Sequence, residues 1–204
     1  TARRQRAINQ AQLHFCDLTE CAIRLSTVPC SNGTREYNLL STTNIPGGDY
    51  LHLSGKEFPE YVYTNTTAST ARVTTRLAGS EDFPQRSVPW LNQNDPGWRD
   101  STGDVPSAFY ERMDGGRRLF GLDTPPIFNT SQVAVVLFPY VAKPQTLTGD
   151  TAIPFSIAST AAGPSTGIRN DLEPYHQAAV HYAASELLKL RKATEQSQTQ
   201  LQLF

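Results

Sequence analysis

The sequence predicts an α+β fold in which an N-terminal helix and a long C-terminal helix pack with an antiparallel β-sheet or β-sandwich region of hairpins. Apolar residues recur every three or four positions near the start of the chain, short alternating segments flank glycine turns in the middle, and no Gly or Pro follows Pro174. With 204 residues and 38% hydrophobic content, the chain can bury a sizeable core. We expect one domain over residues 1–191 and an extension over residues 192–204.

The first element is a helix within residues 1–19. Its apolar residues follow a helical spacing, and the opposite face carries Arg4, Gln5, Asn9 and Gln12. One stripe of this helix is therefore predicted to be buried. The stripe consists of Ala7, Ile8, Ala11, Phe15 and Leu18.

Residues 20–145 form the β-rich part. Turn signals at 31–33, 54–56 and 114–116 each lie between short apolar segments, which predicts three hairpins. The segment "ARVTTRL" is ambiguous between strand and helix, and its Thr and Val content favours a strand. The run "VAVVLFPYVA" is the most continuous apolar stretch and is typical of a strand that is buried on both faces.

Two long loops interrupt this pattern, at residues 78–106 and 146–170. In the first, four prolines are expected to prevent any long regular element. Trp90 and Trp98 lie in the same loop, and we interpret them as anchors that tuck the loop into the core.

The last helix is predicted over residues 171–191. Asp171 is a plausible N-cap, and Pro174 is early enough in the helix to be tolerated. After Ala193 the apolar pattern stops and a polar, glutamine-rich segment follows, which predicts a tail that becomes ordered on binding a partner. The stripe predicted to be buried consists of Leu172, Tyr175, Ala179, Tyr182, Ala183, Leu187 and Leu190.

Charge and hydropathy disfavour two classes of protein, sequence-specific nucleic-acid binders and membrane proteins. A net charge of -1 and a pI near 6.4 disfavour a sequence-specific nucleic-acid binder. The cluster of Arg3, Arg4 and Arg6 is interpreted as a solvated helix face, with phosphate contact as the alternative. No segment is long and apolar enough to suggest a membrane partner, and the start of the sequence shows no apolar signal core.

The sequence predicts no catalytic site, cofactor or metal. The common catalytic and phosphate-binding motifs do not occur. The cysteines show no CxxC spacing, and the two histidines of the last helix are five residues apart, which disfavours a shared metal. We expect the cysteines to be buried as small hydrophobic residues. The histidines and cysteines that could have formed such a site are His14, Cys16, Cys21, Cys30, His176 and His181.

The order of elements carries a resemblance to a known family. The segments "GDVPSAFY" and "LFGLDTPP" occur in succession, and "EPYHQAAVHYAASELLKL" precedes the polar tail. In this layout the chain resembles the head-to-tail adaptor proteins of tailed bacteriophages. The resemblance implies a non-enzymatic virion protein that is made in the host cytoplasm. It also implies a dodecameric ring beneath the portal, in which the subunits extend the DNA channel and connect capsid to tail.

The resemblance also implies sites. The tail would grip the portal protein, the loop at residues 81–103 would contact neighbouring subunits or the next tail component, and the Arg3, Arg4 and Arg6 cluster would face the portal or the channel. DNA would slide through without sequence-specific binding. The tail residues proposed for the portal contact are Lys192, Gln196, Gln198, Gln200, Leu201, Leu203 and Phe204.

Two alternatives stay open at this point. One is a different structural subunit of the virion, such as a stopper or tail-completion protein. The other belongs to another class, a carbohydrate-binding module or hydrolase of α+β type in which Trp90 and Trp98 line a sugar platform.

Overall fold

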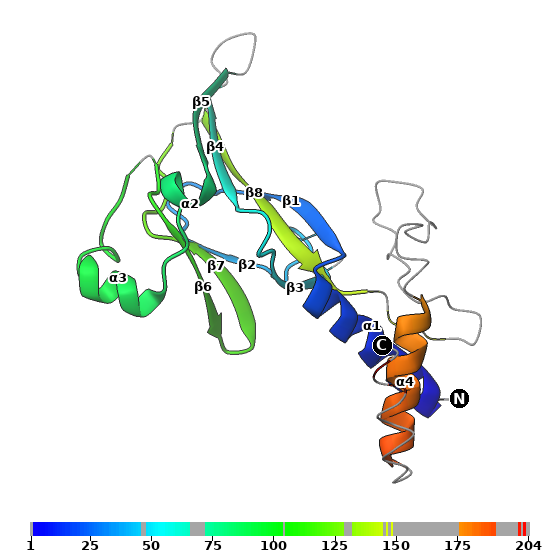
Figure 1. Cartoon of the computed structure of the whole chain (residues 1–204). Helices are drawn as coiled ribbons and strands as arrows, with labels where there is room; N and C mark the ends of the chain where they lie inside the picture. The colour runs from blue at the N-terminus through cyan, green and yellow to red at the C-terminus, as the bar shows by residue number, and fades with distance from the viewer. Residues whose placement is uncertain are drawn as a thin grey trace. The chain divides into compact units, whose positions relative to one another are not determined.

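The computed structural model of the chain divides into two compact units (Figure 1). Residues Thr1–Ile23 and Val141–Phe204 form the first, here called the helical unit, and residues Arg24–Tyr140 form the second, the β unit. Helices and antiparallel sheets together confirm the predicted α+β class. The structure describes residues 2–45, 48–65, 72–103, 105–128, 132–144, 146, 148, 176–190, 200 and 202.

The helical unit is built on two helices, α1 (Ala2–Thr19) and α4 (His176–Leu190). Figure 1 shows α1 in blue and α4 in orange lying side by side. Their shared cluster consists mostly of small residues, so the two backbones can approach closely. The buried members are Ala7, Ala11, Phe15, Cys16, Ala179 and Ala183.

The stripe predicted for α1 is confirmed at Ala7, Ala11 and Phe15 and is wrong at Leu18, which is 63% exposed. Leu18 lies in the last helical turn, where Cys16 takes the buried position instead. For α4, the predicted burial of Ala179 and Ala183 is confirmed.

The predictions for Asp171, Leu172 and Tyr175 lie outside the described residues, as do those for most of the second loop and of the tail.

The β unit contains two antiparallel sheets. The larger has the order β1-β8-β4-β5, with β3 also pairing with β8, and the smaller has the order β2-β7-β6. The strands are β1 (Ile23–Pro29), β2 (Glu36–Asn38), β3 (Tyr50–Leu53), β4 (Glu60–Asn65), β5 (Arg72–Ala78), β6 (Phe109–Asp114), β7 (Arg117–Leu122) and β8 (Gln132–Ala142).

Of the three predicted hairpins, only β6–β7 is confirmed. Gly115 and Gly116 form its turn with φ of 54° and 81°, a left-handed backbone conformation that glycine adopts without strain. The other two predictions are wrong, because β1 and β2 lie in different sheets and β3 pairs with β8 instead of β4. Asn32 and Gly33 do form a turn, but β1 and β3 both pair with β8, and β2 pairs with β7, so these strands find partners that are distant in the sequence.

Among its described residues, the segment 78–106 contains two short helices and no long regular element, as its four prolines predict. These are α2 (Gly79–Asp82) and α3 (Val88–Asn94). Pro89 lies in the first turn of α3, where its missing N–H costs nothing, and the Ser87 side chain caps that turn by accepting a hydrogen bond from the Trp90 N–H. The proline therefore helps to start a helix.

Aromatic rings fill the core of the β unit. Phe120 lies between Phe109 and Phe138, with ring centroids 5.5 and 5.0 Å away, and Phe83 packs on Phe109 at 5.1 Å. The last half of β8 is buried on both faces, as predicted, whereas its first half alternates. The largest fully buried side chains are Tyr50, Tyr61, Phe83, Phe109, Tyr110, Phe120, Phe138 and Tyr140.

Candidate assembly surfaces

One face of the larger sheet carries exposed apolar side chains. In the β4–β8 register, Val62 lies opposite Val135 and Thr64 opposite Val133, so these side chains share a face. Val133 is 47% exposed, whereas its neighbour Ala134 points into the core. We call this the outer sheet face, and it comprises Leu25, Val62, Val133, Val135 and Leu137.

At one end of the outer sheet face lies a pocket of about 440 Å³. Leu25 and Phe58, which are 64% and 49% exposed, line it together with Leu137 and Pro139. Charged side chains also contribute to its lining, namely Lys56, Glu57, Glu60 and Arg76.

Arg76 is held at this pocket by Glu60, whose Oε2 accepts hydrogen bonds from Nε and Nη2 at 2.9 and 2.5 Å. An apolar hollow with charged side chains around it is suited to receive an apolar side chain of another protein. The sequence did not reveal this site, because Phe58 lies outside the strands and reaches the pocket only in the folded chain.

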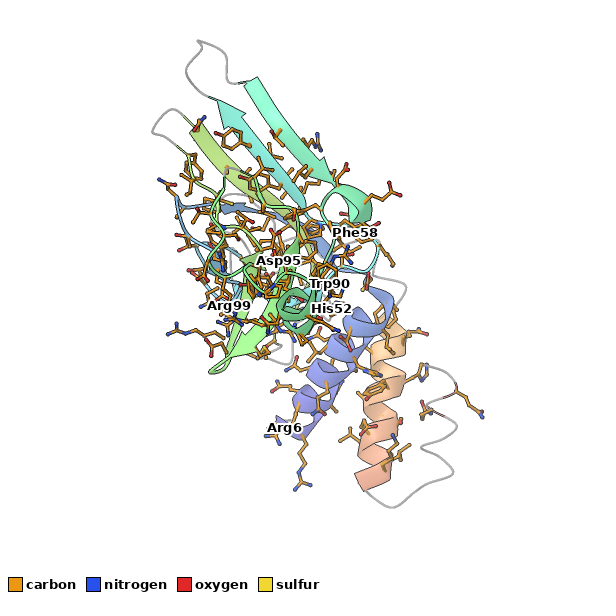
Figure 2. All side chains as sticks on the ribbon, turned by 90° about the vertical axis from the view of Figure 1, so that its left-hand side faces the viewer. Arg6, His52, Phe58, Trp90, Asp95 and Arg99 are labelled. Atoms are coloured by element: carbon orange, nitrogen blue, oxygen red, sulfur yellow. The ribbon has the colours of Figure 1, made fainter. Side chains whose placement is uncertain are left out.

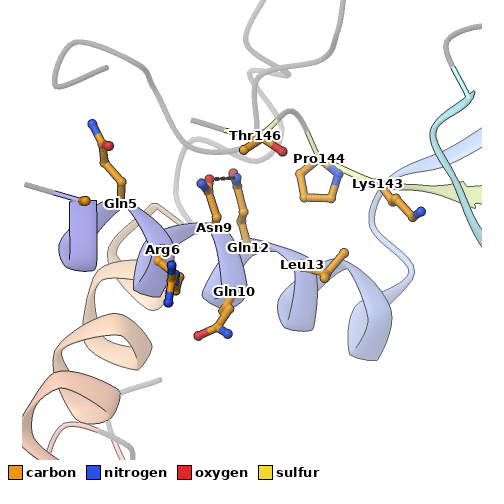
Figure 3. Close-up of a pocket in the computed structure, with 10 residues that line it drawn as sticks. Gln5, Arg6, Asn9, Gln10, Gln12, Leu13, Lys143, Pro144 and Thr146 are labelled. Atoms are coloured by element: carbon orange, nitrogen blue, oxygen red, sulfur yellow. Dashed lines mark hydrogen bonds between the residues drawn. The ribbon is translucent and has the colours of Figure 1, made fainter. Parts of the chain in front are cut away.

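The helical unit carries a polar pocket, also of about 440 Å³, along α1 (Figure 3). Gln5, Asn9 and Gln12 are spaced along one side of the helix, and Gln12 Nε2 donates a hydrogen bond to Asn9 Oδ1 at 2.9 Å. Figure 3 shows Asn9 and Gln12 pointing toward Thr146. Arg6 and Lys143 add two positive charges, so this pocket favours peptide groups and anions as ligands.

The arginine cluster predicted from the sequence lies on α1. Arg3, Arg4 and Arg6 are all exposed, and Figure 2 shows Arg6 near the end of the helix. Arg6 also lines the polar pocket. The first turn of α1 contains no acidic residue, so within that turn the positive charges are not neutralised.

Of the tail residues proposed for portal contact, the structure describes Gln200 alone. Its Oε1 lies 2.8 Å from Nδ1 of His181, a residue of α4. The sequence did not predict His181 as a contact, because Gln200 lies nineteen positions further along the chain. Lys192, Gln196, Gln198, Leu201, Leu203 and Phe204 lie outside the described residues.

The two tryptophans occupy different environments. Trp98 is 3% exposed, and its indole N–H donates to Asn92 Oδ1 at 2.9 Å, as expected of an anchor. Trp90 is 40% exposed, with the Arg86 guanidinium 4.3 Å above its ring, so the prediction of a second buried indole is wrong. Trp90 is the third residue of α3, and Leu91 is the buried residue of that helix. A sugar platform built from both rings is not present, because Trp98 is covered.

Arg35 and Arg99 cover the buried Trp98 ring. Their guanidinium carbons lie 5.1 and 4.9 Å from the ring centroid. The Arg35 guanidinium also donates to the carbonyls of Arg99 and Ser101 at 2.8 and 3.0 Å. The loop after α3 is thus fixed by cation–π contacts and by the two hydrogen bonds that the Arg35 guanidinium donates to its backbone.

Tyrosine hydroxyls in the β unit pair with carboxylates of other strands and loops. Tyr110 and Arg112 both donate to Glu36, and the Arg112 hydrogen bond holds the pKa of that carboxyl below its usual value. Tyr140 donates to Asp49 at 2.9 Å, and burial raises the pKa of both tyrosines. These side-chain hydrogen bonds connect strands of the β unit to one another and to a loop residue, Asp49.

Among the described residues, no group of three or more His, Cys, Asp or Glu side chains is arranged to hold a metal ion. In the same part of the chain, no helix combines the length and the apolar character that a bilayer span requires.

Exposed apolar and basic surfaces on a framework of buried aromatic pairs are typical of a protein that works by binding other proteins. The chain belongs to the SU10 adaptor protein family, whose family model matches residues 1–204, and this is a family of phage head-to-tail adaptors. The resemblance seen in the sequence is thereby confirmed. No protein of curated function matches the sequence.

Proposed function

We propose that the protein is a structural subunit of the phage neck that forms a ring beneath the portal, extends the DNA channel and connects the capsid to the tail. Membership of the adaptor family over the whole chain is the observation that carries this proposal. A structural role in the virion follows more readily from this family than an enzymatic one. The family resemblance points to a dodecamer, made in the host cytoplasm and assembled on the head.

The outer sheet face supports ring formation. Val133 and Leu25 are apolar and exposed, and Phe58 adds to the same area at the pocket. Each subunit of a closed ring buries one surface against each neighbour, so an apolar face that water covers in the single chain is the expected signature. The exposed Trp90 and Arg86 pair offers a second, more polar contact to a neighbour or to a tail component.

We propose that the tail, residues 192–204, docks on the portal while residues 1–191 form the body of the subunit. Its glutamines can hydrogen-bond with a partner backbone, and Leu201, Leu203 and Phe204 supply apolar anchors. Repetition around a ring makes a modest contact per subunit strong through avidity. His181 holds Gln200 in the single chain, so docking on a portal would replace that hydrogen bond.

The exposed arginines of α1 are proposed to face the portal or the channel. Three arginines in the first two turns give a local positive charge on a chain whose net charge is only -1. A local positive charge on a nearly neutral protein suits a channel through which DNA must pass without being bound tightly.

The test is co-sedimentation of the purified chain with tail-less, DNA-filled heads of its parent phage, scored as copies bound per portal. Saturation at about one copy per portal subunit would support the adaptor function, because in the proposed assembly one tail docks on each portal subunit. Deleting Gln196–Phe204 should abolish binding while leaving the circular dichroism spectrum of the body unchanged. Absence of binding by the full chain would overturn the proposal, and unfolding of the shortened chain would show that the tail is part of the core.

A further inference from the structure

Two of the three cysteines lie together at the end of α1. Cys16 is in the last turn of the helix and Cys21 follows the helix by two residues. Their Sγ atoms are 3.7 Å apart, which is contact distance and longer than the roughly 2.05 Å of a disulfide bond. Both are therefore thiols in this structure, with their sulfurs already next to each other.

The end of the helix brings these sulfurs together. Glu20 adopts a left-handed conformation with φ of 50°, and its N–H donates to the Cys16 carbonyl at 3.0 Å. This ends the helix and turns the chain back on its last turn. Cys21 therefore returns beside Cys16, and both pack against the cluster shared by α1 and α4.

We propose that Cys16 and Cys21 form an intramolecular disulfide by exchange with a low-molecular-weight disulfide such as oxidised glutathione. The partly exposed Cys21 thiolate attacks the small disulfide, which gives a mixed disulfide and releases one small thiol. The Cys16 thiolate then attacks the Cys21 sulfur and expels the second small thiol. Two protein thiols are oxidised, one small disulfide is reduced to two thiols, and the two protons pass to those products.

This order of attack follows from exposure. Cys16 is 1% exposed, so a bulky disulfide cannot reach it directly, whereas Cys21 lies at the surface of the cluster. The product ties the end of α1 to the residues that lead into β1. Media outside cells are oxidising, so a protein exported in a virion would meet small disulfides there.

Cys30 is the internal control. It belongs to the β unit, is 8% exposed, and its burial raises the pKa of its thiol to about 12. A buried thiol of such low acidity forms very little thiolate near neutral pH and exchanges slowly. Oxidation that is confined to the helical unit is therefore the specific expectation.

The experiment exposes the full native chain to excess oxidised glutathione, quenches it with acid and digests it. Trypsin cuts after Arg6 and Arg24, so both cysteines fall in the single peptide 7–24, and a second cut after Glu20 separates them. We expect this peptide to lose the mass of two hydrogens and its two pieces to stay joined until dithiothreitol is added. The oxidised protein should melt a few degrees higher than the reduced one, because the bond restricts the unfolded chain.

Three variants identify the mechanism. Cys30→Ser should behave as the parent does, Cys16→Ser should retain one glutathione on Cys21, and Cys21→Ser should leave Cys16 reduced. A parent chain whose peptide 7–24 keeps both thiols, or ends with a stable glutathione on Cys21, would overturn the proposal. So would pairing that appears only in denaturant. None of these outcomes depends on the proposed role in the phage neck.

Discussion

The two compact units bury different kinds of side chain. The described part of the helical unit packs α1 on α4 mainly through alanines such as Ala11 and Ala179, whereas the β unit packs rings such as Phe109, Phe120 and Phe138. A buried aromatic side chain removes several times more apolar surface from water than a buried methyl group does. Within the described residues, the β unit therefore gains more from apolar burial, and the helix pair depends more on the close approach of its two backbones.

The largest loss of stability in the β unit is expected from a substitution that adds atoms beside its aromatic core. A Cβ added at Gly121 would lie 2.6 Å from Cε1 of Tyr110 and closer still to two other atoms of that buried ring. We expect Gly121→Ala to destabilise folding by about 3 kcal/mol or more, since the ring has no room to move. Urea unfolding followed by tryptophan fluorescence would measure the loss.

Gly97→Ala is the matched control for this substitution. A Cβ at Gly97 would approach nothing closer than the Asp95 carboxylate at 4.0 Å. The free energy of unfolding should change by less than about 0.5 kcal/mol. Equal effects of the two variants would mean that Tyr110 is not fixed against strand β7.

Overfilling the helix pair should damage the helical unit and spare the other. Ala179 is fully buried against α1, so Ala179→Leu forces the helices apart at a cost of about 1–3 kcal/mol. Far-ultraviolet circular dichroism should report an early loss of helix, while the near-ultraviolet signal of the aromatic core persists. Val180→Leu, at a position that is 53% exposed, should change neither signal. Simultaneous loss of both signals would show that the two units unfold together.

The Glu36 cluster makes the stability of the β unit depend on pH. Hydrogen bonding by Arg112 lowers the pKa of Glu36 below its ordinary value of 4.5, so this stabilisation is present above pH 4.5 and is lost as the pH falls through the lower folded value. Glu36→Gln should cost about 1–2 kcal/mol near neutral pH, a range that allows for the partial exposure of the pair.

Unfolding free energies measured from pH 7 down to pH 3 would show the effect of Glu36→Gln. The parent and the variant should converge toward the acid end of the range. A constant difference at all pH values would indicate that the charge of Glu36 contributes nothing.

The contrast between the two units also explains what the sequence could predict. The helix period of α1 and the Gly115–Gly116 turn are local signals, and both were confirmed in the structure. Strand pairing in the larger sheet joins β1 to β8, more than a hundred residues away, and no local pattern encodes that choice. The exposure of Trp90 was missed for a related reason, because Pro89, in the first turn of α3, suggested a loop.

The candidate sites were harder to predict than the elements. Arg3, Arg4 and Arg6 stand out in the sequence because they are clustered. The outer sheet face does not, because Leu25, Val62 and Val133 resemble core residues in any hydropathy pattern. The register shows that Val62 and Val133 share the side of the sheet away from the core, and Leu25 lines the pocket at one end of that face. Surfaces assembled from several distant strands are invisible until the pairing is known.

The smallest expected change in stability comes from Leu25→Ser on the outer sheet face. Leu25 is 64% exposed in the single chain, so removing its apolar side chain should alter the free energy of unfolding by less than about 0.5 kcal/mol. If a neighbouring subunit covers this face in the ring, the same substitution places a hydroxyl in a contact from which water is excluded. Each subunit boundary then loses binding free energy, and the loss is repeated around the ring. Binding to heads should then saturate at fewer copies per portal, or at much higher protein concentration, with the melting temperature unchanged.

Val28→Ser is the contrasting variant, since that side chain is fully buried in the same strand and its change should unfold the β unit before any assembly is measured. Normal binding by Leu25→Ser would move the ring contact away from the outer sheet face and toward the Trp90 and Arg86 surface.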